Sequence, residues 1–397
     1  MGRKRNANPT EQGRILILAG VYLPVVGGYI KIIHELAQNL TDSGYTIDIL
    51  TCNSGNAAPC ETLDNINIYR LSSWELVQGN FLVPKISYRN IVALLNLAKN
   101  DYHCIITNTR FYLICFIGWI LSRWHAIPLI HLEHGSRHTV SDNSWVSLIA
   151  NLYDHSAGSL LVRNAAINFG VSAAATEFLR HLGAKKAKIM HNGINFSSFQ
   201  DAKPDADIKR PGSIVITYIG RLIYAKGIQD LLSVFPEIKG DVQLLIVGDG
   251  PYRSELEALA HHGHISNVTF YGEQHPENIP GILKSTDIFV NPSYSEGLPM
   301  SVLEACAAGC AVIATDVGGT EEIILDGLTG FLIKPGDRQD LTEKIGLLLR
   351  DKAIREAIGK DAQAYVMENF SWDQIMGRWI TEMRRLERGV VYTEVDR

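Results

Sequence analysis

The chain has 397 residues, of which 46% are hydrophobic and 20% charged, and its formal net charge is −5. This composition excludes a disordered or fibrous chain and fits a soluble globular protein with room for two domains. The cysteines form no Cys-x-x-Cys pair, so a reducing cytoplasm fits better than a disulfide framework, and Cys306 and Cys310 are expected to be buried free thiols. Residues 1–12 are polar and lack an apolar signal core, so we expect a short mobile tail and no secretion signal.

Charge is unevenly distributed along the chain. Residues 1–200 hold 17 Lys+Arg against 12 Asp+Glu, a net of +5, and residues 201–397 hold 20 against 30, a net of −10. A basic first half suits an anionic surface such as a cytoplasmic membrane leaflet, and ordinary scatter of charge explains it equally well. No nucleic-acid partner is expected.

The first half alternates short apolar runs with helical patterns. Arg14–Ala19 has the length of a strand, a loop with Gly27 and Gly28 follows, and residues 29–40 have the apolar spacing of a helix. Further short buried strands are expected at 46–51, 104–107, 128–131 and 159–162. Continuous apolar runs that alternate with helices indicate a parallel sheet covered on both faces.

The apolar segment 111–121 allows two interpretations. It is too short to cross a bilayer, which needs about 20 residues. It is either a helix that covers the sheet, or a helix that dips into the membrane interface and is anchored by Trp119, Arg123 and Trp124.

A polar stretch at residues 200–211 interrupts the alternation and is interpreted as an interdomain linker. Apolar runs then resume at 214–219, 243–247, 268–271, 288–291 and 311–314. The predicted fold class is therefore α/β, with two Rossmann-like, doubly wound domains facing a cleft. The first domain is expected at 13–199 and the second at 212–370.

Two glutamates mark the most informative segment of the second domain. After the strand 287–291, Glu296 lies in a tight Gly/Pro turn, Pro299 suits the first position of a helix, and Glu304 falls in the first two turns of that helix. Carboxylates accept hydrogen bonds from sugar hydroxyls, and helix N–H groups at the carboxyl edge of a sheet bind phosphate. The suggested ligand is a sugar joined to a phosphate; the alternative is a surface glutamate plus one favoured by the helix dipole.

Arg221 ends a strand of the same domain, and Lys226 lies five residues later, before the next helix. Across a short loop both cations can reach one diphosphate, the arginine as a planar fork and the lysine as a point charge. The alternative is a solvated loop. In the first domain, Gly28 precedes a helix and allows the backbone to approach a phosphate or sugar closely.

His134 follows a strand of the first domain and would face the cleft, where it could bind a sugar hydroxyl or have a structural role. His131, Glu133, His134 and His138 together suggest a metal, but residues on a strand alternate between its faces. These side chains would not converge without a special turn, so no metal ligands are expected.

Taken in order, these segments make the chain resemble the glycosyltransferase family 4 group of retaining enzymes with the GT-B fold. The segments that carry the resemblance are Pro24–Gly28, His134–Gly135, Lys188–Ile194, Gly220–Arg221, Lys226–Gly227, Val247–Pro251 and Glu296–Glu304. The spacing of the two glutamates with the Arg/Lys pair is the specific part.

The resemblance implies roles for the donor-binding residues. Arg221 and Lys226 would neutralise the donor diphosphate, Glu304 would hold the ribose hydroxyls, and Glu296 would bind hydroxyls of the transferred sugar. Backbone groups along this turn would meet phosphate and sugar, although proline has no N–H to donate. The residues of the turn are Gly297, Leu298, Pro299, Met300 and Ser301.

The resemblance also implies roles outside this segment. Backbone near Gln274 would meet the base, His134 would bind the sugar near the reacting face, and Gly28 would lie close to phosphate or acceptor. The last helix, at residues 371–390, would cross back onto the first domain.

The expected function is that of a cytoplasmic, metal-independent retaining glycosyltransferase without a cofactor, with a peripheral position on the membrane as an open question. Its donor would be a UDP- or GDP-sugar and its acceptor lipid-linked or a saccharide, in the synthesis of a surface polysaccharide or glycolipid. The alternatives are a GT-B isomerase or hydrolase of nucleotide sugars, and a nucleotide-sugar-binding protein without turnover.

Overall fold

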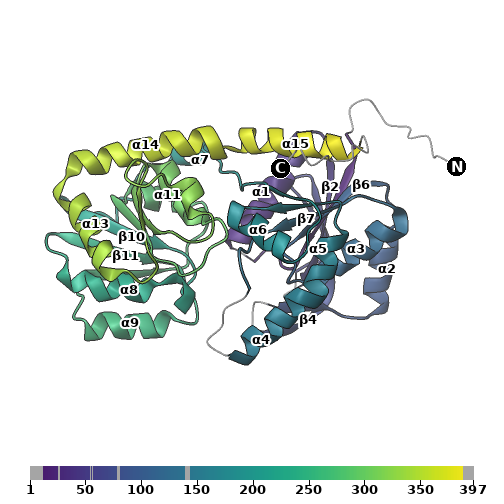
Figure 1. Cartoon of the computed structure of the whole chain (residues 1–397), viewed down its shortest axis with the longest axis horizontal. Helices are drawn as coiled ribbons and strands as arrows, with labels where there is room; N and C mark the ends of the chain where they lie inside the picture. The colour runs from purple at the N-terminus through teal and green to yellow at the C-terminus, as the bar shows by residue number, and fades with distance from the viewer. Residues whose placement is uncertain are drawn as a thin grey trace. The chain divides into compact units, whose positions relative to one another are not determined.

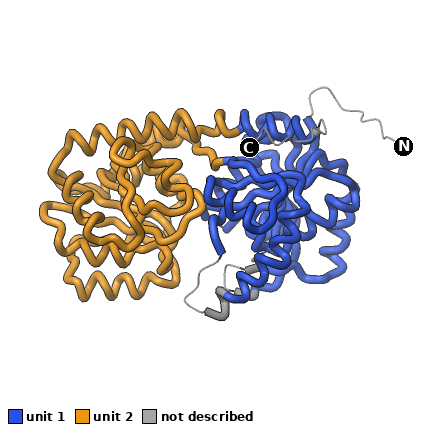
Figure 2. The backbone as a smooth tube through the Cα atoms, viewed as in Figure 1, with its two compact units in different colours: residues 1–190, 376–397 blue, residues 191–375 orange. Residues whose placement is uncertain are grey.

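The computed structural model describes residues 12–25, 27–53, 55, 57–77, 81–138 and 144–387. The chain forms two compact units, shown in Figure 2: unit 1 comprises residues 1–190 and 376–397, and unit 2 comprises residues 191–375. The last helix, α15 (Trp372–Glu387), begins in unit 2, and from Met376 onward its residues belong to unit 1.

Unit 1 contains a sheet with the strand order β3-β4-β2-β1-β6-β7-β8-β9, and β5 pairs with β4. The pairs on the path are parallel except β3 with β4, and the β4–β5 pair is also antiparallel. The strands are β1 (Arg14–Ala19), β2 (Thr46–Asn53), β3 (Cys60–Leu63), β4 (Ile66–Val77), β5 (Phe81–Pro84), β6 (Tyr102–Asn108), β7 (Leu129–Glu133), β8 (Ile167–Gly170) and β9 (Ala187–Ile189).

The helices of unit 1 connect successive strands and can be followed in Figure 1. They are α1 (Gly28–Asp42), α2 (Tyr88–Leu97), α3 (Ile114–His125), α4 (Ser144–Tyr153), the π-helical turn η1 (Asp154–Gly158), α5 (Ser159–Asn164) and α6 (Ala173–His181). The end of α15 also packs here, because Trp379 meets Phe169 of β8 edge to face at 5.2 Å between ring centroids. Lys188 Nζ and Glu382 Oε1, 3.2 Å apart, add an ion pair between β9 and α15.

Unit 2 contains a parallel sheet with the strand order β12-β11-β10-β13-β14-β15. The strands are β10 (Ile214–Ile219), β11 (Val242–Val247), β12 (Val268–Gly272), β13 (Ile288–Asn291), β14 (Ala311–Thr315) and β15 (Phe331–Ile333). Counted from β10, this is the order 3-2-1-4-5-6 of a doubly wound fold, in which the strand order reverses between β10 and β13. Ligands of such sheets bind outside the carboxyl ends of the strands at that reversal.

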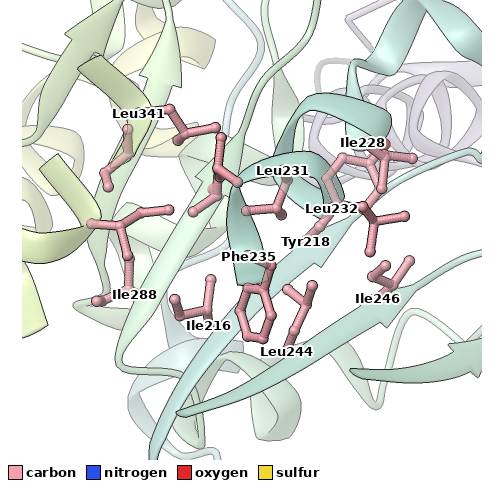
Figure 3. Close-up of a cluster of buried hydrophobic side chains, with 14 of the residues drawn as sticks. Ile216, Tyr218, Ile228, Leu231, Leu232, Phe235, Leu244, Ile246, Ile288 and Leu341 are labelled. Carbon is pink, nitrogen blue, oxygen red and sulfur yellow. The ribbon is translucent and has the colours of Figure 1, made fainter. Parts of the chain in front are cut away.

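Helices cover both faces of the unit 2 sheet: in Figure 1, α8 and α9 lie on one side, and α11 and α14 on the other. The helical segments are α7 (Ser197–Gln200), η2 (Tyr224–Lys226), α8 (Ile228–Val234), η3 (Phe235–Glu237), α9 (Arg253–His262), α10 (Ile279–Lys284), α11 (Met300–Ala308), α12 (Thr320–Ile323), α13 (Arg338–Arg350) and α14 (Lys352–Phe370). Figure 3 shows part of the core between the sheet and α8, where Ile216, Tyr218, Leu231 and Phe235 are buried.

The predicted fold class is confirmed: the chain is α/β, with a doubly wound sheet in each unit. The expected strands at Arg14–Ala19 and 214–219 have the bounds of β1 and β10. Because these strands are buried on both faces, their sequences are continuous apolar runs.

The strand predicted at 159–162 is wrong. These residues begin α5, which continues the helical segment of α4 and η1, and the next strand is β8 at Ile167–Gly170. Leu161 and Val162 are buried while Leu160 is exposed, so the run has one buried face, as a short helix does. A run of this length does not distinguish the two structures by its hydrophobicity alone.

The polar stretch 200–211 lies within unit 2, and not between the units. Asp205 anchors this stretch to the rest of unit 2. The N–H of Asp205 donates to the Gly281 carbonyl at 3.2 Å, and the Asp205 carbonyl accepts from Ser285 Oγ at 3.1 Å. Ile208 is buried as well. Polar composition marked an irregular segment correctly, but it did not reveal these anchoring contacts.

The apolar segment 111–121 forms most of α3, and Ile114, Cys115, Gly118 and Leu121 are buried there. α3 packs against β1 and β6, as a helix that covers the sheet does. Within the described residues, no helix has the length and hydropathy needed to cross a membrane. Cys306 and Cys310 are buried free thiols, as predicted.

Candidate active site

Three of the residues predicted to act on the donor, Arg221, Lys226 and Glu296, lie on loops at the reversal point of the unit 2 sheet. Arg221 follows β10 after Gly220, is exposed, and accepts a hydrogen bond on its backbone oxygen from the Tyr218 hydroxyl at 3.3 Å. Lys226 ends η2 on the same loop. Glu296 lies on the loop between β13 and α11. Because β10 and β13 are parallel neighbours, both loops leave the same edge of the sheet.

The structure brings Lys226 and Glu296 into direct contact. Lys226 Nζ lies 2.7 Å from Glu296 Oε1, and the two side chains are 24% and 11% exposed. The pair is therefore partly shielded from water while remaining accessible. A cation and a carboxylate at this position can bind a phosphate and a hydroxyl group on the same ligand.

Two polar residues that the sequence analysis missed support Glu296. Ser293 Oγ lies 2.7 Å from Glu296 Oε1, and Asn291 Nδ2 lies 3.4 Å from the same oxygen. Ser293 Oγ is also 2.5 Å from Asn291 Oδ1, and since a hydroxyl has one hydrogen, it donates to one of these two oxygens at a time. Both residues follow the apolar part of β13, a position at which polar side chains point to a site.

Two glycines allow the loops of this edge to approach one another closely. Gly227 has φ +67°, and a Cβ there would clash with the Pro292 carbonyl. Gly318 has φ +61°, and a Cβ there would clash with the Glu296 carbonyl. Hydrogen bonds from Tyr294 N to Ala225 O and from Gly319 N to Gly297 O, both 2.8 Å, join the same loops. The backbone around Lys226 and Glu296 is thus fixed from both sides.

The helix α11 begins directly after this loop. The sequence placed Pro299 at the first helical position, but the helix starts at Met300 and Pro299, with extended backbone angles, is the residue before it. Its carbonyl accepts from the N–H groups of Val302 and Leu303. The first N–H groups of a helix have no partner within the helix, so those of Met300 and Ser301 suit a phosphate.

Glu304 lies in the second turn of α11 and is 8% exposed. Gly297 and Leu298 link Glu296 to this helix, so the predicted residues 296–304 form one continuous turn and helix start. Gln274 follows β12 and is held by its own loop: its Nε2 donates to Tyr271 O at 3.1 Å, and its Oε1 accepts from Asn278 Nδ2 at 3.3 Å.

In unit 1, the structure brings Gly28 and His134 to neighbouring positions. Gly28 opens α1, and the ring of the next residue, Tyr29, meets the His134 ring edge to face at 5.1 Å. His134 Nε2 is 3.5 Å from Asn108 Oδ1, at the end of β6. Burial lowers the pKa of His134 to about 4, so its imidazole is neutral near pH 7 and acts as a hydrogen-bonding group rather than a cation.

A buried ionic network lies beside His134. Arg110 Nη1 is 3.0 Å from Glu133 Oε1, and Arg110 Nε is 2.7 Å from Asp154 Oδ1. Burial alone would lower the pKa of Arg110, but the two carboxylates raise it well above its ordinary value. Burial alone would likewise raise the pKa of Glu133, and the attraction of Arg110 lowers it far below its ordinary range. Arg110 and Glu133 are therefore charged, and Arg110 contacts both carboxylates of the network.

The four residues that suggested a metal do not assemble as a ligand set within the described part of the chain. His131 Nδ1 lies 3.0 Å from Thr107 Oγ1, and His131 Nε2 lies 3.5 Å from Glu133 Oε2. His138 contacts Asp154 instead, with 2.7 Å between Nδ1 and Oδ2. His131 and Glu133 lie two residues apart on the same face of β7 and contact each other, whereas His138 lies beyond the strand and contacts a different carboxylate.

Two protein-family models match the chain in adjoining segments. The model described as Glycosyltransferase Family 4 matches residues 26–198, and the model described as Glycosyl transferases group 1 matches residues 199–365. These matches define a glycosyltransferase, and hence an enzyme, and its two doubly wound sheets agree with the GT-B fold. The chain belongs to the family 4 type of these glycosyltransferases.

Curated relatives agree with this assignment. An uncharacterized glycosyltransferase of Methanocaldococcus jannaschii is 27% identical over 387 residues, which cover 94% of this chain and 98% of the relative. A Campylobacter jejuni enzyme, N,N'-diacetylbacillosaminyl-diphospho-undecaprenol alpha-1,3-N-acetylgalactosaminyltransferase, is 29% identical over 62% of this chain and 68% of its own length.

Solved structures share the fold. Sucrose-phosphate synthase from Thermosynechococcus elongatus superposes with a TM-score of 0.81 and 23% identity, covering 96% of this chain and 100% of that one. Anabaena HepE in complex with UDP-glucose gives a TM-score of 0.76 and 20% identity, covering 95% and 100% of the two chains.

Proposed function

We propose that this glycosyltransferase retains the anomeric configuration and moves a sugar from a nucleoside-diphosphate sugar to a lipid-linked or saccharide acceptor. The proposed pathway class is the synthesis of a surface polysaccharide or glycolipid. The observation that carries the donor assignment is the contact of Lys226 with Glu296 at the reversal point of the unit 2 sheet. The UDP-glucose bound to the similarly folded HepE supports a donor of this class.

On the donor side, the departing nucleoside diphosphate gathers negative charge. Lys226, Arg221 and the N–H groups that open α11 are positive or partly positive groups on the loops and helix at this edge. Fixed positive groups of this kind stabilise the leaving group without a divalent metal ion. The diphosphate competes with Glu296 for Lys226, so donor binding releases the carboxylate for the hydroxyls of the transferred sugar.

Glu296 binds the sugar in this proposal and is not a nucleophile. Glu296 Oε1 accepts a hydrogen bond from the Lys226 ammonium group at 2.7 Å and lies 2.7 Å from the Ser293 hydroxyl. Both contacts withdraw negative charge from that oxygen and make it a weaker nucleophile. The acceptor attacks from the face that the leaving group vacates, and the leaving phosphate takes the acceptor's proton. Glu304 holds the ribose, and His134, with its neutral imidazole, hydrogen-bonds a sugar hydroxyl.

The lipid-linked acceptor is supported by the name of the Campylobacter jejuni relative, whose substrate is an undecaprenol diphosphate derivative. Exposed apolar side chains on α4 support a peripheral contact with the membrane: Leu148, Ile149 and Leu152 are 59%, 65% and 70% exposed. Within 111–121 four residues are buried and only Ile120 is exposed, so α4 replaces this segment as the proposed contact surface.

A donor panel tests the proposal. The protein is incubated with UDP- and GDP-sugars, each with and without saccharide and lipid-linked acceptors, and release of nucleoside diphosphate is measured. Release from one donor that depends on an acceptor is expected, and the anomeric configuration of the product reports retention. Release or isomerisation of equal rate without any acceptor would contradict transfer, and donor binding without turnover would contradict catalysis.

A further inference from the structure

Three histidines from separate segments of unit 1 form a cluster at its surface. His138 lies on the loop after β7, His155 in the π-helical turn η1, and His181 at the end of α6. Each offers one ring nitrogen such that the three nitrogen atoms lie within 4.8 Å of one another. We propose that His138, His155 and His181 bind one Zn²⁺ ion. We call these residues the histidine triad.

Aromatic packing alone accounts for part of this arrangement, since the His138 ring meets Phe178 edge to face at 5.0 Å. The rings also surround a common point, with centroids 5.1, 5.4 and 5.9 Å apart in the pairs 138–155, 155–181 and 138–181. Ring packing does not require one nitrogen atom of each ring to lie near the same point. Binding of one shared ion does require this arrangement.

A buried carboxylate orients one ring of the histidine triad. Asp154 Oδ2 lies 2.7 Å from His138 Nδ1, so this nitrogen carries the hydrogen and Nε2 offers its lone pair. Asp154 is itself fully buried and fixed by Arg110 through bonds of 2.7 and 2.9 Å. Metal-binding histidines generally donate their other ring N–H to a carboxylate, a backbone carbonyl or water, which fixes the tautomer and raises the basicity of the ligand. Asp154 also precedes His155 directly, so one turn supplies both a ligand and this orienting group.

The chemical type of the ligand atoms determines which metal ion the histidine triad would bind. Three imidazole ligands without a carboxylate or thiolate suit Zn²⁺ and its neighbours in the transition series, whereas Mg²⁺ and Ca²⁺ require oxygen ligands. Zinc–nitrogen bonds of about 2.0–2.1 Å place tetrahedral donors roughly 3.3 Å apart, so the rings would close inward slightly. His155 and His181 are exposed and can rotate to do so, and water would fill the fourth position.

A bound ion would join the loop after β7, η1 and the end of α6. That loop begins at His134, so the ion would restrain the segment that carries the predicted sugar contact. The role is one of positioning, and it does not depend on the identity of the sugar donor.

Binding of Zn²⁺ to the metal-free full-length protein tests the proposal. Calorimetry against a competing chelator should give one ion per chain, and Co²⁺ should produce visible absorption bands of a four-coordinate site. His155→Ala and His181→Ala should each weaken Zn²⁺ binding at least tenfold and abolish the rise in melting temperature that Zn²⁺ causes in the wild type. Since both side chains are exposed, the metal-free variants should melt near the wild-type temperature.

A matched control comes from unit 2. His261 and His262 are exposed neighbours at the end of α9, with ring centroids 6.0 Å apart. The double substitution His261→Ala/His262→Ala should bind Zn²⁺ as the wild type does. Weak or non-stoichiometric binding to the wild type, or equal affinity of the wild type and the His155→Ala and His181→Ala variants, would overturn the histidine triad as a site. Loss of Zn²⁺ binding in the His261→Ala/His262→Ala control, with binding kept in the His155→Ala and His181→Ala variants, would also overturn it.

Discussion

Lys226 and Glu296, separated by 70 positions in the sequence, share an ion pair of 2.7 Å at the carboxyl edge of the unit 2 sheet. Each follows a strand next to the reversal of strand order, and the loops that carry them are joined by backbone hydrogen bonds. The two side chains are 24% and 11% exposed, so the pair is partly shielded but still accessible to a ligand at the edge where doubly wound sheets bind theirs. Its position favours a role in ligand binding, which single substitutions can test.

We expect Lys226→Ala to lower turnover by about 10²-fold, because one positive group at a developing charge is worth about 3 kcal/mol. The melting temperature should change little. Lys352→Ala is the matched control, since Lys352 Nζ also lies near a glutamate, 3.5 Å from Glu356 Oε1, but is 76% exposed on α14. Steady-state kinetics beside a thermal melt is the measurement; near-normal turnover of a well-folded Lys226→Ala variant would remove this residue from the site.

Glu304→Gln and Glu296→Gln should affect different steps. Contacts to the ribose persist unchanged into the transition state, so Glu304→Gln should chiefly weaken donor binding. Contacts to the transferred sugar change during the reaction, so Glu296→Gln should chiefly slow transfer. Affinity for the nucleoside diphosphate and single-turnover rates separate the two effects. Equal losses of nucleoside diphosphate affinity in both variants would contradict this division.

The pKa of His134, lowered by burial to about 4, makes the stability of the protein depend on pH. In the unfolded chain a histidine titrates near 6.5, so between these values the unfolded state binds more protons. This contribution to the free energy of unfolding is present above pH 6.5 and decreases by roughly 3 kcal/mol as the pH falls to 4. Chemical denaturation at several pH values should show a shallower dependence for His134→Gln, and an unchanged one for the exposed control His262→Gln. If the free energy of unfolding depends on pH equally in His134→Gln and in the wild type, the contribution of His134 is refuted.

Turnover should not require Mg²⁺ or Mn²⁺. Lys226 and Arg221 supply positive charge at the proposed donor site, so adding either ion to protein treated with EDTA should change the rate little. The proposed histidine triad would not respond to these ions, because they prefer oxygen ligands. Activity that EDTA abolishes and Mg²⁺ or Mn²⁺ restores would disprove the metal-independent mechanism.

Liposome flotation tests the membrane contact. The net charge of +5 in residues 1–200 and the exposed apolar residues of α4 predict binding to anionic vesicles at low salt, weakened as salt rises. Leu148→Ser/Ile149→Ser/Leu152→Ser should reduce flotation, whereas Leu259→Ser/Leu328→Ser, at exposed positions of unit 2, should not. A protein that fails to float with anionic vesicles at low salt has no such contact, and flotation that ignores salt would favour apolar insertion over charge.

Much of the fold could be predicted from the sequence because most central strands are buried on both faces. Runs such as 214–219 and 288–291 are apolar except for Thr217 and Asn291, and they coincide with β10 and β13. The run at 159–162 shows the limit of this signal, since a short apolar segment fits a buried strand and one face of a helix equally well.

Local signals also placed Lys226 and Glu296 on short connections between a strand and a helix, and the structure brings the two side chains into contact. Their role in donor binding stays a prediction. The support that Ser293 gives to Glu296 was missed, although its position after β13 was a usable signal. The ion pair of Arg110 with Asp154 and the histidine triad join residues from distant segments without any regular spacing. Such contacts arise only when the chain folds, so no local pattern announces them.

The division of the chain has a consequence for its synthesis on the ribosome. Residues 191–375 of unit 2 emerge before Met376 and the rest of α15, which complete unit 1. Until then Phe169 lacks its buried neighbour Trp379, and Lys188 lacks Glu382. The half that is made first should therefore finish folding last, and a stop codon after Ile375 should leave an unstable, chaperone-dependent unit 1 beside an intact unit 2.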